Sequence, residues 1–166
     1  MFRMNPYAVH LGDRDARDVL SQTSHELTLL MARLGPEGLE RSPGPGKWTA
    51  RGIICHLADC EAAFAFRLRQ TLAQEDHVIQ PFDQERWGDR YRSPSLSAAA
   101  ALETFGAVRR WNLALLDTVT AEEFNKQVSH PERGQMTFRT IIETMAGHDQ
   151  NHLKQLQRIA DAGEIA

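Results

Sequence analysis

Cysteine, surplus charge and long apolar runs are all scarce in this chain, and each shortage excludes a class of proteins. The only two cysteines, Cys55 and Cys60, would point about 140° apart on a helix, so they cannot bond to each other. This excludes the disulfide framework that is typical of small secreted domains. The net charge of −3 provides no cationic field that would attract phosphates, so we expect no nucleic-acid partner.

No apolar run approaches the roughly 18 residues that a membrane-spanning helix needs, so we also expect no membrane partner. The first ten residues, MFRMNPYAVH, contain no apolar segment of the kind found in signal peptides, which predicts a cytoplasmic protein. The composition that remains, with 42% hydrophobic and 25% charged residues, is that of a globular protein. Residues 1–166 are therefore expected to form a single domain with its own core.

Helical periodicity is present almost everywhere, because apolar residues recur at steps of three and four. The predicted helices cover about residues 13–34, 50–74, 95–119 and 138–159. Gly35 and Pro36 should end the first helix, while Thr49 and Thr137 should cap the second and the fourth. Four amphipathic helices of this length bury their apolar stripes best against one another, so the sequence predicts an all-α four-helix bundle.

Two long connections interrupt this pattern, at residues 75–95 and 119–136. Long segments of this kind tend to be functional or disordered. The first contains Phe82, Trp87 and Tyr91, which favours a packed segment that covers one end of the bundle. The second is expected to contain one short helical turn and no strand.

Two histidines on the last predicted helix lie four residues apart, in GHDQNH. On a helical wheel of about 100° per residue, His152 lies about 40° and His148 about 80° from the centre of the apolar stripe. Asp149 lies about 20° from it, so all three residues face inward. A pair of imidazoles at this spacing can give two nitrogens to one metal ion. The alternative is a pair of hydrogen-bonded core histidines, which avoids the several kcal/mol that unpaired burial costs.

A third ligand is available on the second helix, where His56 lies at the edge of the apolar face. Three histidines would leave coordination positions open, which is typical of catalytic rather than structural metal sites. The other histidines are expected at the surface: His10, His25, His77 and His130. Cys60 also points inward, as a small core residue or, alternatively, as a soft metal ligand. HDQNH further resembles the zincin motif with Asp149 as the general base, although no third ligand follows it.

Inward charges on the second and third helices need partners or a cavity. Glu61 falls within the stripe of the second helix, and Arg109 and Asn112 fall within that of the third. One hypothesis is a buried ion pair of Glu61 with Arg109 or Arg67. The other is a cavity in which Arg109 anchors an anionic ligand.

Four segments in this order resemble the DinB-like superfamily, and more closely its YfiT-like branch: KWTARGIICHLADCE, FDQERWGDRY, RRWN and GHDQNHLKQLQRI. The likeness covers most of the chain, from Trp48 to Ile159. It implies helices that run up, down, down and up. It also implies one divalent metal ion per chain, zinc or nickel, held by His56, His148 and His152, and it implies a homodimer.

Members of this superfamily include thiol-dependent transferases that use bacillithiol, mycothiol or glutathione, a maleylpyruvate isomerase, and metal-dependent hydrolases. The resemblance favours a thiol S-transferase that acts on small electrophiles through a metal-bound thiolate. Its cosubstrate would be a low-molecular-weight thiol. The candidate anchors for the carboxylates of that thiol are Arg67, Arg109 and Arg110. A hydrolase that activates water is the first alternative. The second is a non-catalytic, metal-stabilised protein of stress response or ligand binding. Asp149 is expected either to orient a ligand such as His56 or to act as a general base.

Overall fold

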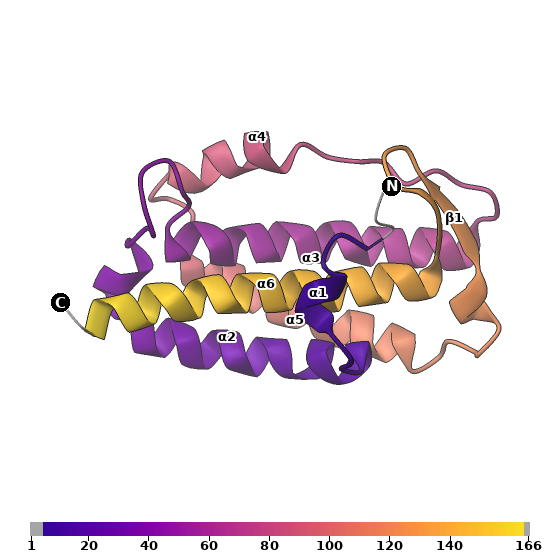
Figure 1. The fold of residues 1–166 in the computed structure, drawn as a ribbon, viewed down its shortest axis with the longest axis horizontal. Helices are drawn as coiled ribbons and strands as arrows, with labels where there is room; N and C mark the ends of the chain where they lie inside the picture. Colours follow the sequence, from indigo (N-terminus) through magenta and orange to yellow (C-terminus); the bar gives the residue numbers. More distant parts are fainter. Residues whose placement is uncertain (1–4, 165–166) are drawn as a thin grey trace.

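A computed structural model describes residues 5–164, and four long helices account for most of them (Figure 1). These helices are α2 (Ala16–Leu39), α3 (Ala50–Ala73), α5 (Ala98–Leu116) and α6 (Phe138–Glu164). Three short helices accompany them, α1 (Ala8–Leu11), α4 (Gln84–Gly88) and η1 (Asp89–Arg92), together with the single turn η2 (Glu123–Asn125). No helix of the described part is long and apolar enough to cross a lipid bilayer.

The helices follow the up, down, down, up order, which confirms the predicted bundle (Figure 1). The chain reverses direction from α2 to α3, and the link after α3 then runs back along the bundle, so that α5 is parallel to α3. Helix α6 reverses once more and lies beside α2 and α3, while α5 packs against α3 and α2. As a result, α3 and α6 are antiparallel neighbours, and their inward side chains can meet.

The helix starts follow from local capping. Thr49 caps α3 by accepting a hydrogen bond from the backbone N–H of Gly52, and Ser97 caps α5 in the same way. Thr137 accepts one from the N–H of Thr140 at the start of α6. The first helix is longer than predicted: Gly35 adopts a positive φ of 60°, which kinks the chain, and a further turn continues through Pro36 to Leu39.

The second connection contains a β-hairpin that the sequence did not predict. Strand β1 (Gln127–His130) pairs antiparallel with β2 (Gly134–Thr137), and Val78 bridges to Ser129, which joins the two long connections. Strands of four residues are too short for a clear alternating pattern, so their pairing depends on the tertiary structure. The predicted helical turn is present as η2.

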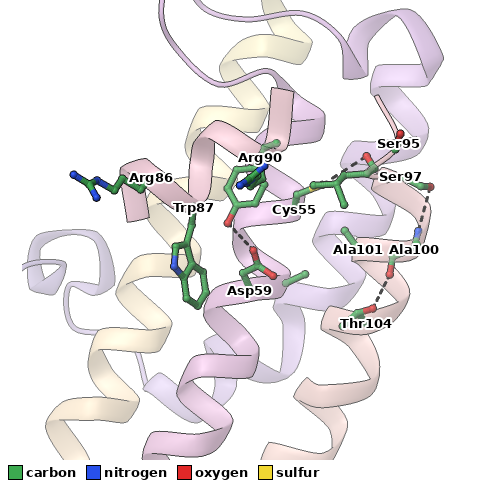
Figure 2. Close-up of a pocket in the computed structure, with 13 residues that line it drawn as sticks. Cys55, Asp59, Arg86, Trp87, Arg90, Ser95, Ser97, Ala100, Ala101 and Thr104 are labelled. Atoms are coloured by element: carbon green, nitrogen blue, oxygen red, sulfur yellow. Dashed lines mark hydrogen bonds between the residues drawn. The ribbon is translucent and has the colours of Figure 1, made fainter. Parts of the chain in front are cut away.

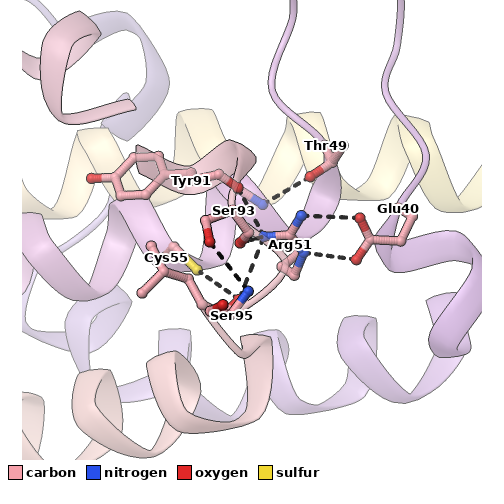
Figure 3. A network of polar contacts seen from close by, with 9 residues as sticks. Glu40, Thr49, Arg51, Cys55, Tyr91, Ser93 and Ser95 are labelled. Atoms are coloured by element: carbon pink, nitrogen blue, oxygen red, sulfur yellow. Dashed lines mark hydrogen bonds and ion pairs between the residues drawn. The ribbon is translucent and has the colours of Figure 1, made fainter. Parts of the chain in front are cut away.

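The first connection lies along α3 rather than over one end of the bundle (Figure 1). Tyr91 is buried, whereas Trp87 is 41% exposed and stacks on Phe82. The buried Arg51 holds this segment, because its Nη1 donates to the backbone carbonyls of Tyr91 and Ser93 at 2.8 and 2.9 Å (Figure 3). Its Nε donates to Glu40 at 2.7 Å, which ties the segment to the end of α2 as well.

Two apolar clusters and a set of buried polar residues, the polar layer, make up the core. One cluster includes Leu20, Phe64 and Met145, and the other includes Leu27, Leu57 and Leu153. The polar layer contains buried residues from all four long helices: Thr23, His56, Glu61, Arg109, Asn112, His148, Asp149 and His152. Burial of so many polar groups is costly unless they are paired, so this layer is the first place to look for a function.

Candidate metal centre

Three histidines from two antiparallel helices converge on one side of the polar layer. His56 lies in the second turn of α3, and His148 and His152 lie one turn apart on α6. The His56 ring centroid is 5.1 Å from that of His148 and 4.8 Å from that of His152, and all three residues are buried. The structure therefore brings together the three histidines that the sequence singled out.

Cys60 joins this cluster. The Nε2 atoms of His56 and His148 are 3.1 Å apart, and the Cys60 Sγ lies 3.5 Å from the His56 Nε2. Donor atoms of His56, Cys60 and His148 all lie within 4.8 Å of one another. Cys60 follows His56 by four residues on the same face of α3, which is the signal in the sequence that should have raised its rank as a ligand.

These separations fit a divalent metal ion. Two nitrogens bound to a tetrahedral zinc at about 2.05 Å are about 3.3 Å apart, and a nitrogen and a thiolate sulfur at about 2.3 Å are about 3.6 Å apart. The observed distances are 3.1 Å and 3.5 Å. Nitrogen and sulfur donors are also the set that zinc and nickel prefer. The residues present therefore fit the ion that the family resemblance implies.

His152 stands slightly apart from these donors. Its ring packs against the His148 ring, with centroids 4.5 Å apart, but its nitrogens are not part of the group of closely spaced donor atoms. The Nδ1 atom lies 3.1 Å from the side-chain oxygen of Gln155, a contact that holds the ring in place. A side-chain acceptor on one ring nitrogen leaves the other nitrogen available as a ligand.

Burial keeps these histidines uncharged. It lowers the pKa of His56 to about 3, with a further contribution from His152, and it lowers the pKa of His152 to about 4. Burial, with further contributions from His152 and His56, also lowers the pKa of His148 well below its ordinary value. Neutral imidazoles are the form that binds metal, so the site offers its nitrogens without first losing protons at neutral pH.

Aromatic rings enclose the cluster on two sides. Trp48 packs on the His56 ring with centroids 4.6 Å apart, and Tyr7 meets the His148 ring edge-on at 5.1 Å. The approach of Tyr7 requires Gly147, because a Cβ atom there would lie 2.5 Å from the Tyr7 carbonyl oxygen. Desolvation raises the pKa of Tyr7, so its phenol stays protonated at neutral pH.

Two clefts reach the cluster from the surface. The larger, of about 510 Å³, is lined by His56 and His152 and has Tyr7 and Trp48 among its walls. The smaller, of about 180 Å³, is lined by His148 and Cys60. The donor atoms are thus buried among protein atoms yet border space that a small molecule can enter.

A third cleft, of about 560 Å³, lies between α3, the α4–η1 segment and the start of α5 (Figure 2), and Tyr91 is one of the residues that line it. The hydroxyl of Tyr91 donates to Asp59 at 2.8 Å on its wall. Cys55 rather than Cys60 borders it, and none of the three histidines does. It is therefore separate from the candidate metal centre.

Arg109 and the two buried carboxylates form their own network. The guanidinium makes a two-pronged contact with Glu61, at 2.9 and 2.7 Å, and its Nη1 donates to Asp149 at 2.8 Å. Asn112 donates to Glu61 at 2.8 Å. Burial alone would lower the pKa of Arg109, but the charges of Asp149 and Glu61 raise it, so it remains cationic. This is the buried ion pair that was one of the two sequence hypotheses.

Two expected roles are corrected by this network. Arg109 is 1% exposed and engaged by protein carboxylates, so it borders none of the clefts described above and is not placed to anchor a ligand. Asp149 faces Arg109 and not His56, and within residues 5–164 its carboxylate makes no hydrogen bond to a histidine. The wheel position was right, but which neighbouring helix the side chain would meet was not.

The comparisons with known proteins agree with this fold. Residues 20–156 match the family model of the DinB superfamily. A protein from Oceanobacillus iheyensis is 29% identical over 123 residues, which cover 74% of this chain and 71% of the relative. One from Bacillus licheniformis is 29% identical over 143 residues, which cover 83% and 79%. Both relatives are provisionally named metal-dependent hydrolases.

The solved structure of YfiT from Bacillus subtilis superposes with a TM-score of 0.82 and covers 90% of this chain and 86% of that one. YfiT is described as a probable metal-dependent hydrolase with an unusual four-helix bundle topology. At 20% sequence identity, this likeness speaks for the fold alone.

Proposed function

The chain belongs to the DinB superfamily, and from that premise we propose that it is a metal-dependent enzyme acting on a small molecule. Its centre would be a divalent ion, zinc or nickel, held by His56, His148 and His152, with the thiol of Cys60 close beside it. The observation that carries the proposal is a set of uncharged, closely spaced donors that border two clefts.

When bound, such an ion supplies Lewis-acid chemistry and lowers the pKa of a coordinated water or thiol. The protein supplies the surroundings. Trp48 and Tyr7 limit the access of bulk water to the imidazoles, and Gln155 orients His152. Tyr7, which lines both clefts and stays protonated, can donate a hydrogen bond to an oxygen of the substrate.

Hydrolysis is the reaction we favour, because the relatives named above carry that name. A purely structural metal site would be closed by four protein ligands. The buried carboxylates that could close it, Glu61 and Asp149, are engaged by Arg109. Cys60 is the remaining side chain that could close the site as a fourth protein ligand. Burial raises the pKa of its thiol, so Cys60 would bind only if the ion displaced its proton.

Elemental analysis of the purified protein tests the metal centre. We expect close to one divalent ion per chain, and loss of that ion in the double variant His56→Ala/His148→Ala. The matched control is His25→Ala, which removes an exposed imidazole on α2, a helix that contributes no histidine to the cluster. Unchanged metal content in the double variant would refute the proposed ligands.

Turnover separates the enzymatic proposals from a stabilising role. We expect hydrolysis of p-nitrophenyl acetate that disappears on chelation, returns with zinc or nickel, and is absent in His148→Ala. A protein that holds its metal but turns over neither an ester nor a thiol acceptor would be a metal-stabilised binding protein instead.

Thiol transfer is the second candidate, and a specific observation favours it. Arg67 and Arg133 line the smaller cleft beside His148 and Cys60, where they could hold the carboxylates of a low-molecular-weight thiol. Conjugation of glutathione to monochlorobimane, dependent on the metal and faster than the ester hydrolysis, would favour the transferase. Ester hydrolysis without any conjugation would favour the hydrolase.

A further inference from the structure

The smaller cleft has two arginines and one glutamate among its lining residues, although the chain as a whole has a net charge of −3. Arg67, Arg133 and His130 line it, and His148 and Cys60 border the same space. His130 was expected at the surface, yet it is buried at the end of β1. Helix α3 supplies Arg67, two turns beyond Cys60, and the turn of the β-hairpin supplies Arg133. The arrangement therefore exists only in the folded chain.

Arg67 is held in place with donors to spare. Its guanidinium lies 5.6 Å from the centroid of the Phe64 ring and 5.4 Å from that of the Phe82 ring, and one Nη2 hydrogen bond goes to the carbonyl of Gln80 at 3.1 Å. A guanidinium carries five N–H donors, so several remain free. The two aromatic contacts fix its orientation without neutralising its charge.

The side chain of Arg133 has even fewer polar partners than that of Arg67. It is half-buried, and among residues 5–164 its side chain makes no hydrogen bond or ion pair. Glu132 is the one acidic residue lining the cleft, and it is exposed. Burial lowers the pKa of both arginines, and the charge of Arg133 lowers that of Arg67 further. Two guanidiniums that line one small cleft, where the exposed Glu132 is the acidic residue present, are stabilised further by an anion from outside.

We infer that this cleft is an oxyanion-binding subsite, in which Arg67 and Arg133 together bind a carboxylate or phosphate group of the substrate. Guanidiniums match the planar, two-pronged geometry of these groups. His130 contributes a further hydrogen bond. A cleft of about 180 Å³ holds only a short anionic head, so the remainder of the substrate would extend toward His148. This inference rests on the proposed function for the part played by the metal centre, but anion binding itself does not depend on it.

The test is a titration of the purified protein with inorganic phosphate and, separately, with acetate, followed by ¹⁵N–¹H NMR. We expect at least one of the two anions to bind. Arg133→Gln and Arg67→Gln should each weaken that binding roughly 10- to 100-fold, because a hydrogen-bonded charge is lost. Arg92→Gln is the matched control, because Arg92 is largely exposed and its ion pair with Asp89 is long, at 3.7 Å. Arg133→Lys, which keeps the charge but not the fork, should fall between.

The two arms separate the sources of the oxyanion. Binding of acetate assigns a carboxylate substrate, and binding of phosphate alone assigns a phosphate ester. Metal content is measured on the same samples, so that the two proposals can be tested separately. If the purified protein holds no metal but binds an anion, and Arg133→Gln abolishes that binding, the subsite is supported and the metal centre is refuted. The subsite is refuted if Arg133→Gln and Arg92→Gln bind both anions with the same affinity. It is also refuted if the native protein binds neither anion.

Discussion

Glu61 and Asp149 share the guanidinium of Arg109, so the stability of the polar layer is most sensitive to substitutions in this network. Glu61 accepts three hydrogen bonds, two of them from Arg109 and one from Asn112. Removal of one partner from a buried ion pair costs more than the pair contributes, because a charge is left uncompensated. The role of the network is thus to hold four helices in register beside the candidate metal centre.

Loss of the Glu61 charge should destabilise the fold without emptying the metal site. We expect Glu61→Gln to lower the free energy of unfolding by roughly 3–5 kcal/mol and Asp149→Asn to lower it by less, since Glu61 would still pair with Arg109. Urea denaturation measures the stability, with the exposed Glu103→Gln on α5 as control. Metal content should be unchanged in all three variants. Loss of metal from a fully stable Asp149→Asn protein would instead restore its role as a partner of the ligands.

The buried histidines should make the metal-free protein acid-sensitive. The folded-state pKa of His56 is about 3 and that of His152 about 4, both below the unfolded value of about 6.5. Between these limits only the unfolded chain takes up the protons, so their contribution to stability is complete above pH 6.5 and is lost as the pH falls.

We therefore expect the free energy of unfolding to drop by about 1–3 kcal/mol between pH 6.5 and pH 5.5 after chelation, at up to about 1.4 kcal/mol per pH unit for each histidine. Urea titrations at several pH values measure the slope. His152→Leu should reduce it, whereas His25→Ala should not. A metal-free protein equally stable at both pH values would contradict the burial of neutral imidazoles.

Arg51 is the anchor of the segment that runs along α3, because three carbonyls of that segment lie within reach of one Nη atom (Figure 3). A second anchor is the close fit of Gly88 against the Trp48 ring, where a Cβ atom would approach to 2.6 Å. The segment forms part of the wall of the larger histidine-lined cleft through Gln84 and Glu85. Its docking thus shapes access to the candidate metal centre.

Release of this anchor should expose the segment to proteolysis. We expect chymotrypsin to cleave the native protein slowly after the buried Tyr91 and at least several-fold faster in Arg51→Met, since cleavage requires local opening. Arg86→Met is the matched control on the same segment, because its side chain is 86% exposed. Equal cleavage rates at Tyr91 in both variants would show that Arg51 does not hold the segment.

Large apolar side chains are exposed along the face shared by α3 and α5. Phe66 is 64% and Trp111 is 67% exposed, and the guanidinium of Arg69 lies over the Trp111 ring. Exposed aromatic residues of this kind are typical of interaction surfaces. The homodimer implied by the family resemblance stays a prediction, and this face is where we expect it to form.

Sedimentation equilibrium should therefore give twice the chain mass of 18.7 kDa. The double variant Phe66→Ser/Trp111→Ser should sediment as a monomer at micromolar concentration. Leu29→Ser on α2, whose side chain is 56% exposed, removes a comparable apolar group from another helix and should leave the dimer intact. A monomeric native protein would refute the expectation.

The sequence alone determined the helices and the histidine pair. Apolar periodicity and local caps such as Thr49 are interactions within a few residues of the chain, so they can be read without knowing the fold. For the same reason His148 and His152 were certain to share one face of α6. Four such helices have few ways to bury their stripes, which is why the bundle followed from the pattern.

Only the tertiary structure decided which side chains meet across helices. The rotation and axial register of α3 against α6 set the 3.1 Å separation between His56 and His148. They also place Asp149 where it accepts a hydrogen bond from Arg109 and not from His56. The β-hairpin, which carries Arg133 and His130 to the smaller cleft, gains its hydrogen bonds only when its two strands pair. Such contacts join residues far apart in the chain, and no local pattern encodes them.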